Sequence, residues 1–270
     1  MHEYPATENQ ALYVEIESGA VTVTASGTDR VEVELTGAGA DDVSVQQDGD
    51  RVTVLGPRSR GFTRTRSVHV RITTPTGSDL VTKLGSASVE GTGMLGTVRV
   101  STGSGSVTLD EVDGHAVVRT GSGDIGLRRI GAEADLQSGS GDIAVGELVG
   151  TSRLATGSGD IVVDHAEGAV SAKSGSGDLR VDEAGSRTSL ASASGDLEVR
   201  RMAAGQAQLK NVSGDIRLGI PAGTPVWTDI STATGHVKSG LTPTGAPTEG
   251  QPYVEVTAKT VTGDVYLDQL

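Results

Sequence analysis

The chain contains no cysteine and very few aromatic residues, with one Phe, one Trp and four Tyr among 270 residues. Without cysteine, neither a disulfide framework nor a thiolate metal site can form. The scarcity of rings argues against a wide core filled by large aromatic side chains. It favours a narrow interior that admits Val, Ile, Leu and Ala.

Targeting and membrane-spanning patterns are also absent from the sequence. Residues 1–20 lack the basic start and apolar run of a signal peptide, and no apolar stretch approaches the ~20 residues of a membrane span. The net charge of −13 argues against nucleic acid as a partner, because phosphate contacts need a basic face. We therefore expect a cytoplasmic protein without a membrane span, for which association with a surface stays open.

Glycine, by contrast, is abundant, at 39 residues of 270, and much of it belongs to a repeated signature, Gly-Ser-Gly-Asp-Ile. The slot of the fourth signature residue returns every 18 residues, at Ser88, Ser106, Asp124, Asp142, Asp160, Asp178 and Asp196. Weaker copies follow at Asp215, His236 and Asp264. Self-similarity at a fixed interval predicts a repeat architecture in which each unit packs on its neighbours.

Within one repeat, apolar residues alternate in two short runs. Counted from the slot as position 0, positions 1 and 3 (Ile125 and Leu127) and positions 10 and 12 (Ala134 and Leu136) are apolar in most units. Position 6 is also apolar, as in Met94. Such alternation predicts two strands per unit, each with one buried face, and the signature glycines suit turns that need a positive φ.

The prediction is an all-β fold, a parallel β-solenoid with about 18 residues and two short strands per coil and irregular β caps at both ends. A triangular helix with an apolar residue at every sixth position would bury either the Asp or Gly131 and Gln137, so two sheets are favoured. We expect a single continuous domain. Its parts are irregular β coils or a cap over 1–80, regular repeats over 81–220, and irregular coils with a Pro/Gly-rich insertion over 221–270.

The Ser/Thr-Gly-Ser-Gly-Asp-Ile/Leu units, the irregular strands before them and the closing segment 260–265 together resemble the DUF4097 family, the bacterial "putative adhesin" β-strand repeat proteins. The resemblance covers nearly the whole chain from about Leu12. It implies a β-solenoid and an adhesin-like label, and it brings no established catalytic residues.

The signature aspartates are the first candidates for a site, because stacked like charges repel unless something compensates them. Each carboxylate can accept N–H bonds from its own turn, as in an Asx-turn, or a calcium ion can be shared between coils. The spacing differs from that of the calcium β-roll, because here Asp directly follows Gly and an apolar residue directly follows Asp. We favour turn capping and expect no metal or cofactor. The alternative is a calcium ladder at Asp124, Asp142, Asp160, Asp178 and Asp196.

Two other groups of residues have side chains that occur in catalytic or metal sites, but they lack the partner residues that such sites need. Thr or Ser recurs at position 14, yet no His or Lys recurs beside it to activate a nucleophile. We expect these hydroxyls to bond along the solenoid axis. Asp164 and His165 lie in a turn without a second His nearby, so they do not form a metal set. The chain is therefore not expected to be an enzyme.

One basic segment stands out, with Arg58, Arg60, Arg64 and Arg66 and no acid within residues 57–66. It is either a solvated loop or a docking element for an acidic polymer or another anionic partner. We expect a non-enzymatic, adhesin-like interaction or scaffold protein that presents repetitive polar surfaces. Its partner is an unknown protein or acidic polymer, and it is a monomer or weak oligomer.

Two alternatives for the function stay open. One is a scaffold that assembles into filaments, which needs uncapped and complementary ends. The other is a β-helix enzyme that acts on a carbohydrate polymer, although such enzymes place their catalytic groups on protruding loops. No insertion interrupts the repeats from Ser88 to Asp196.

Overall fold

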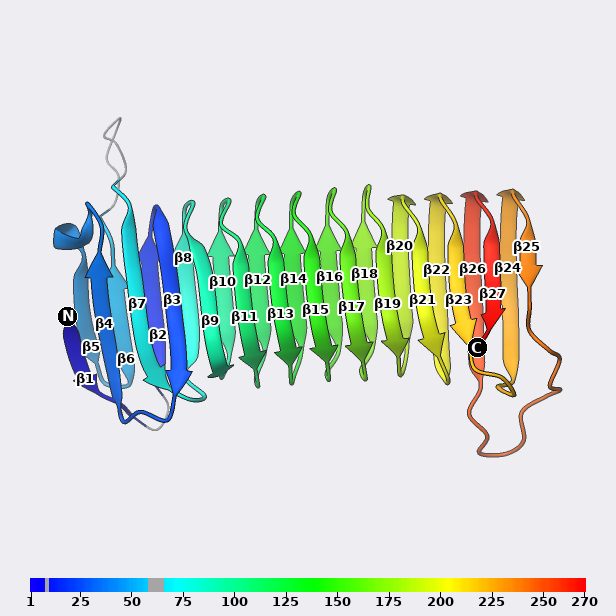
Figure 1. Ribbon diagram of the computed structural model, residues 1–270, viewed down its shortest axis with the longest axis horizontal. Helices are drawn as coiled ribbons and strands as arrows, with labels where there is room; N and C mark the ends of the chain where they lie inside the picture. The colour runs from blue at the N-terminus through cyan, green and yellow to red at the C-terminus, as the bar shows by residue number, and fades with distance from the viewer. Residues whose placement is uncertain (8–9, 58–65) are drawn as a thin grey trace. The chain divides into compact units, whose positions relative to one another are not determined.

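The computed structural model describes residues 1–7, 10–57 and 66–270. Apart from a short 3-10 turn at Ala40–Asp42, the regular elements of the described chain are β-strands joined by turns and loops (Figure 1). The chain is compact in two units, Met1–Gly139 and Ser140–Leu270. No helix among these residues has the length and apolar character needed to cross a membrane. The division into three parts expected from the sequence stays a prediction.

The first unit contains fourteen strands arranged in two sheets. They are β1 (His2–Pro5), β2 (Ala11–Ile16), β3 (Gly19–Ser26), β4 (Arg30–Thr36), β5 (Ser44–Asp48), β6 (Arg51–Leu55), β7 (Val68–Pro75), β8 (Asp79–Leu84), β9 (Ser88–Leu95), β10 (Val98–Thr102), β11 (Val107–Val112), β12 (Ala116–Thr120), β13 (Ile125–Ile130) and β14 (Ala134–Ser138). One sheet has the order β1-β4-β7-β3-β9-β11-β13, and the other has the order β5-β6-β2-β8-β10-β12-β14.

The second unit also has two sheets, built from thirteen strands. They are β15 (Ile143–Leu148), β16 (Ser152–Thr156), β17 (Ile161–Ala166), β18 (Val170–Ser174), β19 (Leu179–Ala184), β20 (Thr188–Ser194), β21 (Leu197–Met202), β22 (Gly205–Ser213), β23 (Ile216–Ile220), β24 (Val226–Thr234), β25 (Val237–Ser239), β26 (Val254–Thr262) and β27 (Val265–Gln269). The orders are β15-β17-β19-β21-β23-β27-β25 and β16-β18-β20-β22-β26-β24.

Regular strands within each unit pair in parallel and in the register that the repeat predicts. Val98 lies beside Ala116, and Ala116 lies beside Ala134, each 18 residues further along the chain. In the second unit, Ile161 lies beside Leu179 in the same way. The prediction of a parallel β-solenoid with two strands per coil is confirmed.

The interior between the two sheets is filled by the predicted apolar positions. Leu136 in the first unit and Leu154 in the second, both at position 12, are each 0% exposed. Their neighbours in sequence face outward, with Asp135 half-buried and Arg153 exposed. The alternation of side chains along a strand explains this pattern, because consecutive residues point to opposite faces.

One coil departs from the expected positions. Met94 was predicted to fill position 6, but Leu95 is the buried residue there and Met94 is only half-buried. The pairing of β9 with β11 shifts by one residue at this place, a β-bulge that includes Gly93 at φ +82°. The extra residue turns the following side chains over, so Leu95 faces inward.

Only some signature glycines have the expected positive φ, such as Gly195 at +142° and Gly214 at +128°. Gly121 and Gly123 do not have a positive φ. A Cβ on Gly123 would lie 2.0 Å from the carbonyl oxygen of Gly105 in the preceding coil. Glycine is therefore needed because neighbouring backbones approach closely at this turn.

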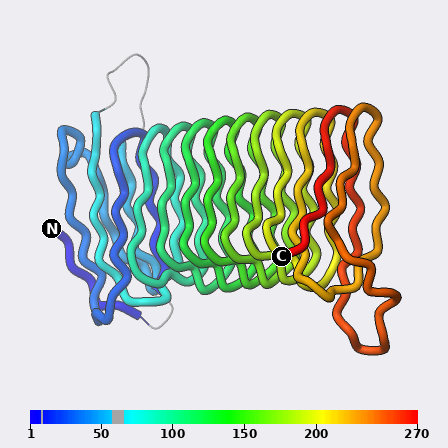
Figure 2. The backbone as a smooth tube through the Cα atoms, turned by 45° about the vertical axis from the view of Figure 1, so that its right-hand side comes forward, coloured from blue at the N-terminus to red at the C-terminus, as the bar shows by residue number. Residues whose placement is uncertain are grey.

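Both ends of the chain leave the simple order of coils. Strands β1, β4 and β7 pair antiparallel in the first unit, and so do β5 and β6. In the second unit, the last coil in sequence, β26–β27, lies between β22–β23 and β24–β25 (Figures 1 and 2). The segment β24–β25 therefore forms the outermost coil of that unit, although it precedes β26–β27 in the sequence.

Candidate functional site

The Ser/Thr column is a buried hydrogen-bond ladder, as predicted. Thr120 donates its hydroxyl to the carbonyl oxygen of Gly105 at 3.1 Å and accepts the N–H of Gly123 at 3.0 Å. The same donation to the preceding coil recurs at Thr102, Ser138, Thr156, Ser174 and Ser192. These hydroxyls stabilise the turns, and their burial keeps them from any substrate.

The signature aspartates form a second ladder, which differs from the predicted one. In the second unit, Asp142 Oδ1 accepts the N–H of Asp160 at 2.9 Å, and Asp160 Oδ1 accepts the N–H of Asp178 at 2.8 Å. The predicted partner was an N–H of the residue's own turn, and this was wrong. The N–H of Gly159 in that turn already donates to Thr156, whereas the next coil offers an N–H within reach of the carboxylate.

A serine performs the same task where the signature lacks aspartate. Ser106 Oγ accepts the N–H of Asp124 at 3.3 Å in the first unit. The slot therefore needs a short side chain with an acceptor, and a negative charge is not required. Each acceptor binds the backbone of one coil to the next.

The candidate calcium ladder at Asp124, Asp142, Asp160, Asp178 and Asp196 stays a prediction. In the part of the chain that the structure describes, no three His, Cys, Asp or Glu side chains are gathered as a metal site. One oxygen of Asp142, Asp160 and Asp178 already accepts a backbone N–H, which leaves less of each carboxylate for an ion.

We expect the melting temperature of the protein to differ little between a chelator and millimolar calcium. The hydrogen bonds between coils already compensate the stacked carboxylates, so an ion adds little to the folded state. Thermal unfolding followed by circular dichroism in both buffers provides the measurement. A rise of many degrees in calcium would show that the column is a metal site.

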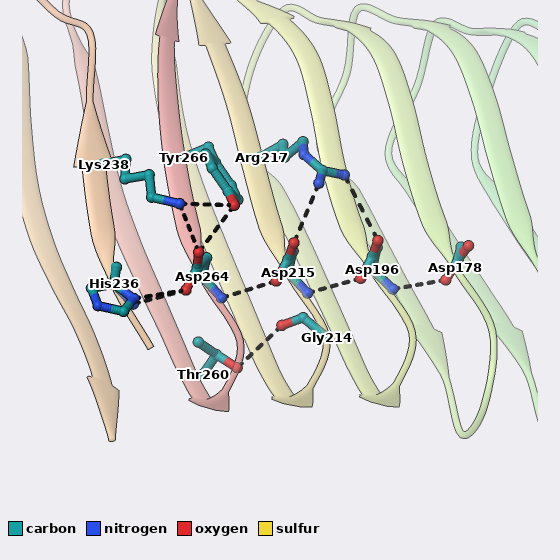
Figure 3. A network of polar contacts seen from close by, with 10 residues as sticks. All are labelled: Asp178, Asp196, Gly214, Asp215, Arg217, His236, Lys238, Thr260, Asp264 and Tyr266. Atoms are coloured by element: carbon teal, nitrogen blue, oxygen red, sulfur yellow. Dashed lines mark hydrogen bonds and ion pairs between the residues drawn. The ribbon is translucent and has the colours of Figure 1, made fainter. Parts of the chain in front are cut away.

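At the C-terminal end of the second unit, the aspartate ladder continues out of sequence order (Figure 3). Asp215 Oδ1 accepts the N–H of Asp264 at 2.9 Å, and Asp264 Oδ1 accepts the N–H of His236 at 2.9 Å. Reading the weaker copies in chain order placed His236 directly after Asp215. The insertion of β26–β27 makes Asp264 the neighbour of both.

A polar cluster surrounds Asp264 at this end (Figure 3). Lys238 Nζ donates to Asp264 Oδ2 at 2.9 Å, and the hydroxyl of Tyr266 donates to the same oxygen at 3.0 Å. The Lys238 ammonium also lies 4.7 Å from the centre of the Tyr266 ring. The hydrogen bond from Lys238 is the main reason why the pKa of Asp264 is far below its usual range, with the His236 N–H and Tyr266 adding to it. The hydrogen bonds to Asp264 and Tyr266 raise the pKa of Lys238.

Sequence reasoning missed this cluster, because its place in the repeat gives no distinctive signal. Arg217, Lys238 and Tyr266 each lie two residues after a weak signature slot, and Arg180 and Glu198 stand at the same position in regular repeats. Arg217 contacts Asp215 at 3.3 Å and Asp196 at 3.8 Å (Figure 3). The cluster is partly exposed, and through His236 and Lys238 it joins the outermost coil to β27.

We expect Asp264→Asn to lower the melting temperature at neutral pH, because the amide keeps an acceptor for His236 and loses the charge that pairs with Lys238. The folded-state pKa of Asp264 is depressed, so the charge stabilises the fold above the unfolded-state pKa of ~4 and this effect is lost at lower pH. The difference in melting temperature between the two proteins should therefore shrink as the pH falls from 5 towards 2. This range follows from the unfolded-state pKa of ~4 for an Asp side chain.

The matched control is Asp268→Asn, which removes a charge from an exposed residue of the same strand. Thermal scans at a series of pH values compare the three proteins. A difference between wild type and Asp264→Asn that stays constant with pH would contradict the role of the charge.

The arginine segment is only partly within the described residues. Arg58, Arg60 and Arg64 lie outside them. Arg66 forms an ion pair with Asp42, with 3.4 Å between Nη1 and Oδ2. The structure thus gives one of the four arginines a partner on the same chain.

Charged side chains on β17, β19 and β21 of the second unit pair between coils. His165 contacts Glu183 at 3.1 Å, and Arg200 contacts Asp182 at 3.4 Å. These pairs are solvent-exposed, and each contributes little to stability. Asp164 and His165 were expected in a turn, and this was wrong, because both lie in β17. His165 belongs to a surface pair.

The family model described as "Toastrack DUF4097" matches residues 9–268. The chain belongs to the DUF4097 family. Solved structures similar to this DUF4097 chain include a "putative adhesin" from Bacteroides fragilis, with 15% identity, a TM-score of 0.41, and coverage of 98% of this chain and 95% of that chain. Another is a "putative lipid binding protein" from Parabacteroides distasonis, with 14% identity, a TM-score of 0.37, and coverage of 100% and 95%. A search of curated proteins found no match.

Proposed function

We propose that this DUF4097 protein is a non-enzymatic, adhesin-like interaction scaffold that presents rows of polar side chains. The observation that carries the proposal is the strict register of its outward residues. On one sheet of the second unit, Arg153 lies beside Ser171 and Ser171 beside Ser189. In the neighbouring row, Lys173 lies between Ala155 and Ala191. A surface of this kind repeats its chemistry at the coil spacing of ~4.8 Å, which suits a repetitive or extended partner.

The use of the polar side chains at the signature turns supports a scaffold over an enzyme. The Ser/Thr hydroxyls and the aspartate carboxylates bind neighbouring coils together. A hydrolase or lyase on a β-helix would need acids or bases that converge on a substrate. Among the described coils from β10 to β21, the turns are short, and charged strand residues form ion pairs at the surface instead.

We further propose that Arg58, Arg60, Arg64 and Arg66 dock an acidic partner. Four guanidinium groups within residues 57–66 form a concentrated positive charge on a chain whose net charge is −13. Arginine favours carboxylate and phosphate groups because its planar fork makes paired hydrogen bonds. A polyanion would first displace Asp42 from Arg66.

The test replaces all four arginines with Ser and measures binding to immobilised polyglutamate. We expect folding to persist and binding to be lost, and wild-type binding should weaken steeply with salt because exposed charges are screened over ~10 Å at 0.1 M. The matched control replaces four exposed arginines elsewhere, Arg51, Arg99, Arg153 and Arg201, and so removes the same charge. Equal loss in both variants, or retained binding in the first, would overturn the role of this segment.

A further inference from the structure

The outermost coil of the second unit ends in two unpaired strand edges. In the described chain, β24 is the last strand of one sheet and β25 is the last strand of the other. Strand β24 is nine residues long, and a free edge of that length presents a row of unpaired N–H and C=O groups. Natural proteins normally shorten, cover or charge such an edge.

The inward side chains of this coil are uncovered as well. Val226, Ile230 and Val237 occupy the register of buried residues in the next coil, where Val254 and Val265 are each 0% exposed. Val237 is nevertheless 49% exposed, and Val226 and Ile230 are only half-buried. An open hollow of about 480 Å³ is lined by these residues and, on one side, by residues 241–245 of the segment that follows β25. In every inner coil, the equivalent space is covered by a further coil.

The terminal strands at the N-terminal end of the chain differ from β24 and β25. In the first unit, the terminal strands β1 and β5 are four and five residues long and carry side chains that link them. The Tyr4 hydroxyl donates to the Val45 carbonyl at 3.1 Å, and Gln47 Nε2 donates to the Pro5 carbonyl at 3.0 Å. One terminal coil is thus closed by cross-links, and the other is open.

The charges on the open coil are already balanced within the chain. Asp229 pairs with Lys259 at 3.2 Å, and Lys238 pairs with Asp264 at 2.9 Å. A surface with internally paired charges can meet an identical surface without bringing unpaired like charges together. This distinguishes the open coil from the acidic remainder of the chain, whose net charge of −13 opposes association of two copies.

We propose that the open coil formed by β24 and β25 binds the same coil of a second copy of this chain, in a two-fold symmetric dimer. In every inner coil, a neighbouring coil covers the apolar residues. The second copy supplies such a coil for β24 and β25, with side chains at the same spacing. A contact that uses the same patch on both copies closes on itself. Because only one end of each chain is open, assembly stops at two copies.

The two-fold axis sets β24 antiparallel to its counterpart, an arrangement that a strand edge accepts. Centred on Ile230, the pairing places Thr228 opposite Thr232 of the second copy, and cross-strand pairs of threonines are favourable because their hydroxyls can hydrogen-bond. Trp227 lies opposite the small Ala233 of the second copy, so its ring has room to lie over the facing strand. Trp227, which is 62% exposed in the single chain, becomes covered.

Trp227 is the only tryptophan in the sequence, so its fluorescence reports on this strand alone. We expect the mass measured by sedimentation to double as the protein concentration rises to the order of 100 µM, where a micromolar contact is populated. The emission maximum of Trp227 should move to shorter wavelength in step with the mass.

Two variants of neighbouring residues on β24 separate edge pairing from other causes. Ile230→Lys places a charge in the hollow and should raise the dissociation constant at least ~10-fold. Ser231→Lys adds the same charge to the outward face and should dimerise like the wild type. Both sites are at least partly exposed, so both variants should fold, and their melting curves check this.

Three results would overturn the proposal. The first is a wild-type chain that stays monomeric over the whole concentration range. The second is growth beyond two copies, because filaments would require the closed first-unit end to act as the partner. The third is equal loss of dimerisation in Ile230→Lys and Ser231→Lys, which would place the contact on the outward face. These results do not depend on binding of an acidic partner, so they leave the proposed scaffold role untouched.

Discussion

Gly123→Ala is expected to lower the free energy of unfolding by more than about 3 kcal/mol, at the upper end of what single substitutions cost. The added Cβ would lie 2.0 Å from the carbonyl oxygen of Gly105, and this oxygen belongs to the backbone of the preceding coil. Neither atom can move without changing the distance between two coils. The Thr120 hydroxyl also binds both Gly105 and Gly123, so the same shift breaks its two hydrogen bonds.

Chemical denaturation of the intact chain measures this effect, and Gly126→Ala is its matched control. Gly126 lies three residues further on, in β13, and a Cβ there would meet nothing within 4 Å. Replacing glycine where space and backbone permit stabilises a protein by ~0.4–1 kcal/mol. If the two variants had the same stability, close approach of coils would not be the reason for the repeated glycine.

Leu154→Ala is expected to destabilise the protein by ~2–5 kcal/mol, the usual range for a buried Leu. Leu154 lies in β16 with 0% of its surface exposed and points between the two sheets of the second unit. A cavity in one coil also weakens its contacts with the coils on both sides, because each repeat is stabilised by its neighbours.

Arg153→Ala provides the comparison for this substitution within the same strand. Arg153 points outward and is exposed, so its loss should change the free energy of unfolding by less than ~0.5 kcal/mol. Leu136→Ala should repeat the large effect in the first unit, where that residue is also 0% exposed. Similar effects at Leu154 and Arg153 would show that the assignment of inward positions is wrong.

The regular coils were predictable from the sequence because several independent signals share one period. The spacing of Asp124 and Asp142, the alternation at Ile125 and Leu127, and the recurring glycines all repeat every 18 residues. Two alternating runs per period leave two sheets as the arrangement that buries the apolar residues and exposes the aspartates. Local pattern and global packing agree in these coils, which is the condition for reading a fold from sequence.

The structure differs from the prediction where contacts between residues far apart in the chain determine which residues are buried and which strands pair. The bulge at Gly93 changes which of Met94 and Leu95 is buried, and one inserted residue is hard to recognise in a short strand. The order of the last coils depends on β26–β27 pairing with β22 and β23, across an insertion that the sequence marks only as a longer spacing. No local signal distinguishes that arrangement from simple succession.

The polar columns were only partly predictable for a similar reason. Their positions follow from the repeat, and the Ser/Thr hydroxyls bond along the axis as expected. The partner of each aspartate depends on which N–H groups the glycine turn has already used, and that requires three-dimensional positions. Arg58, Arg60 and Arg64 lie outside the described residues, and their docking role stays a proposal.

The insertion of β26–β27 beneath β24–β25 has a consequence for the synthesis of the chain. A ribosome makes the protein from its N-terminus, and each regular coil can be laid on the coil already folded. The coil β24–β25 is made before β26–β27, on which it lies in the folded protein. The second unit therefore cannot acquire its final order of strands until residues 254–269 have been translated. Until then, the growing chain exposes the free edges of β22 and β23.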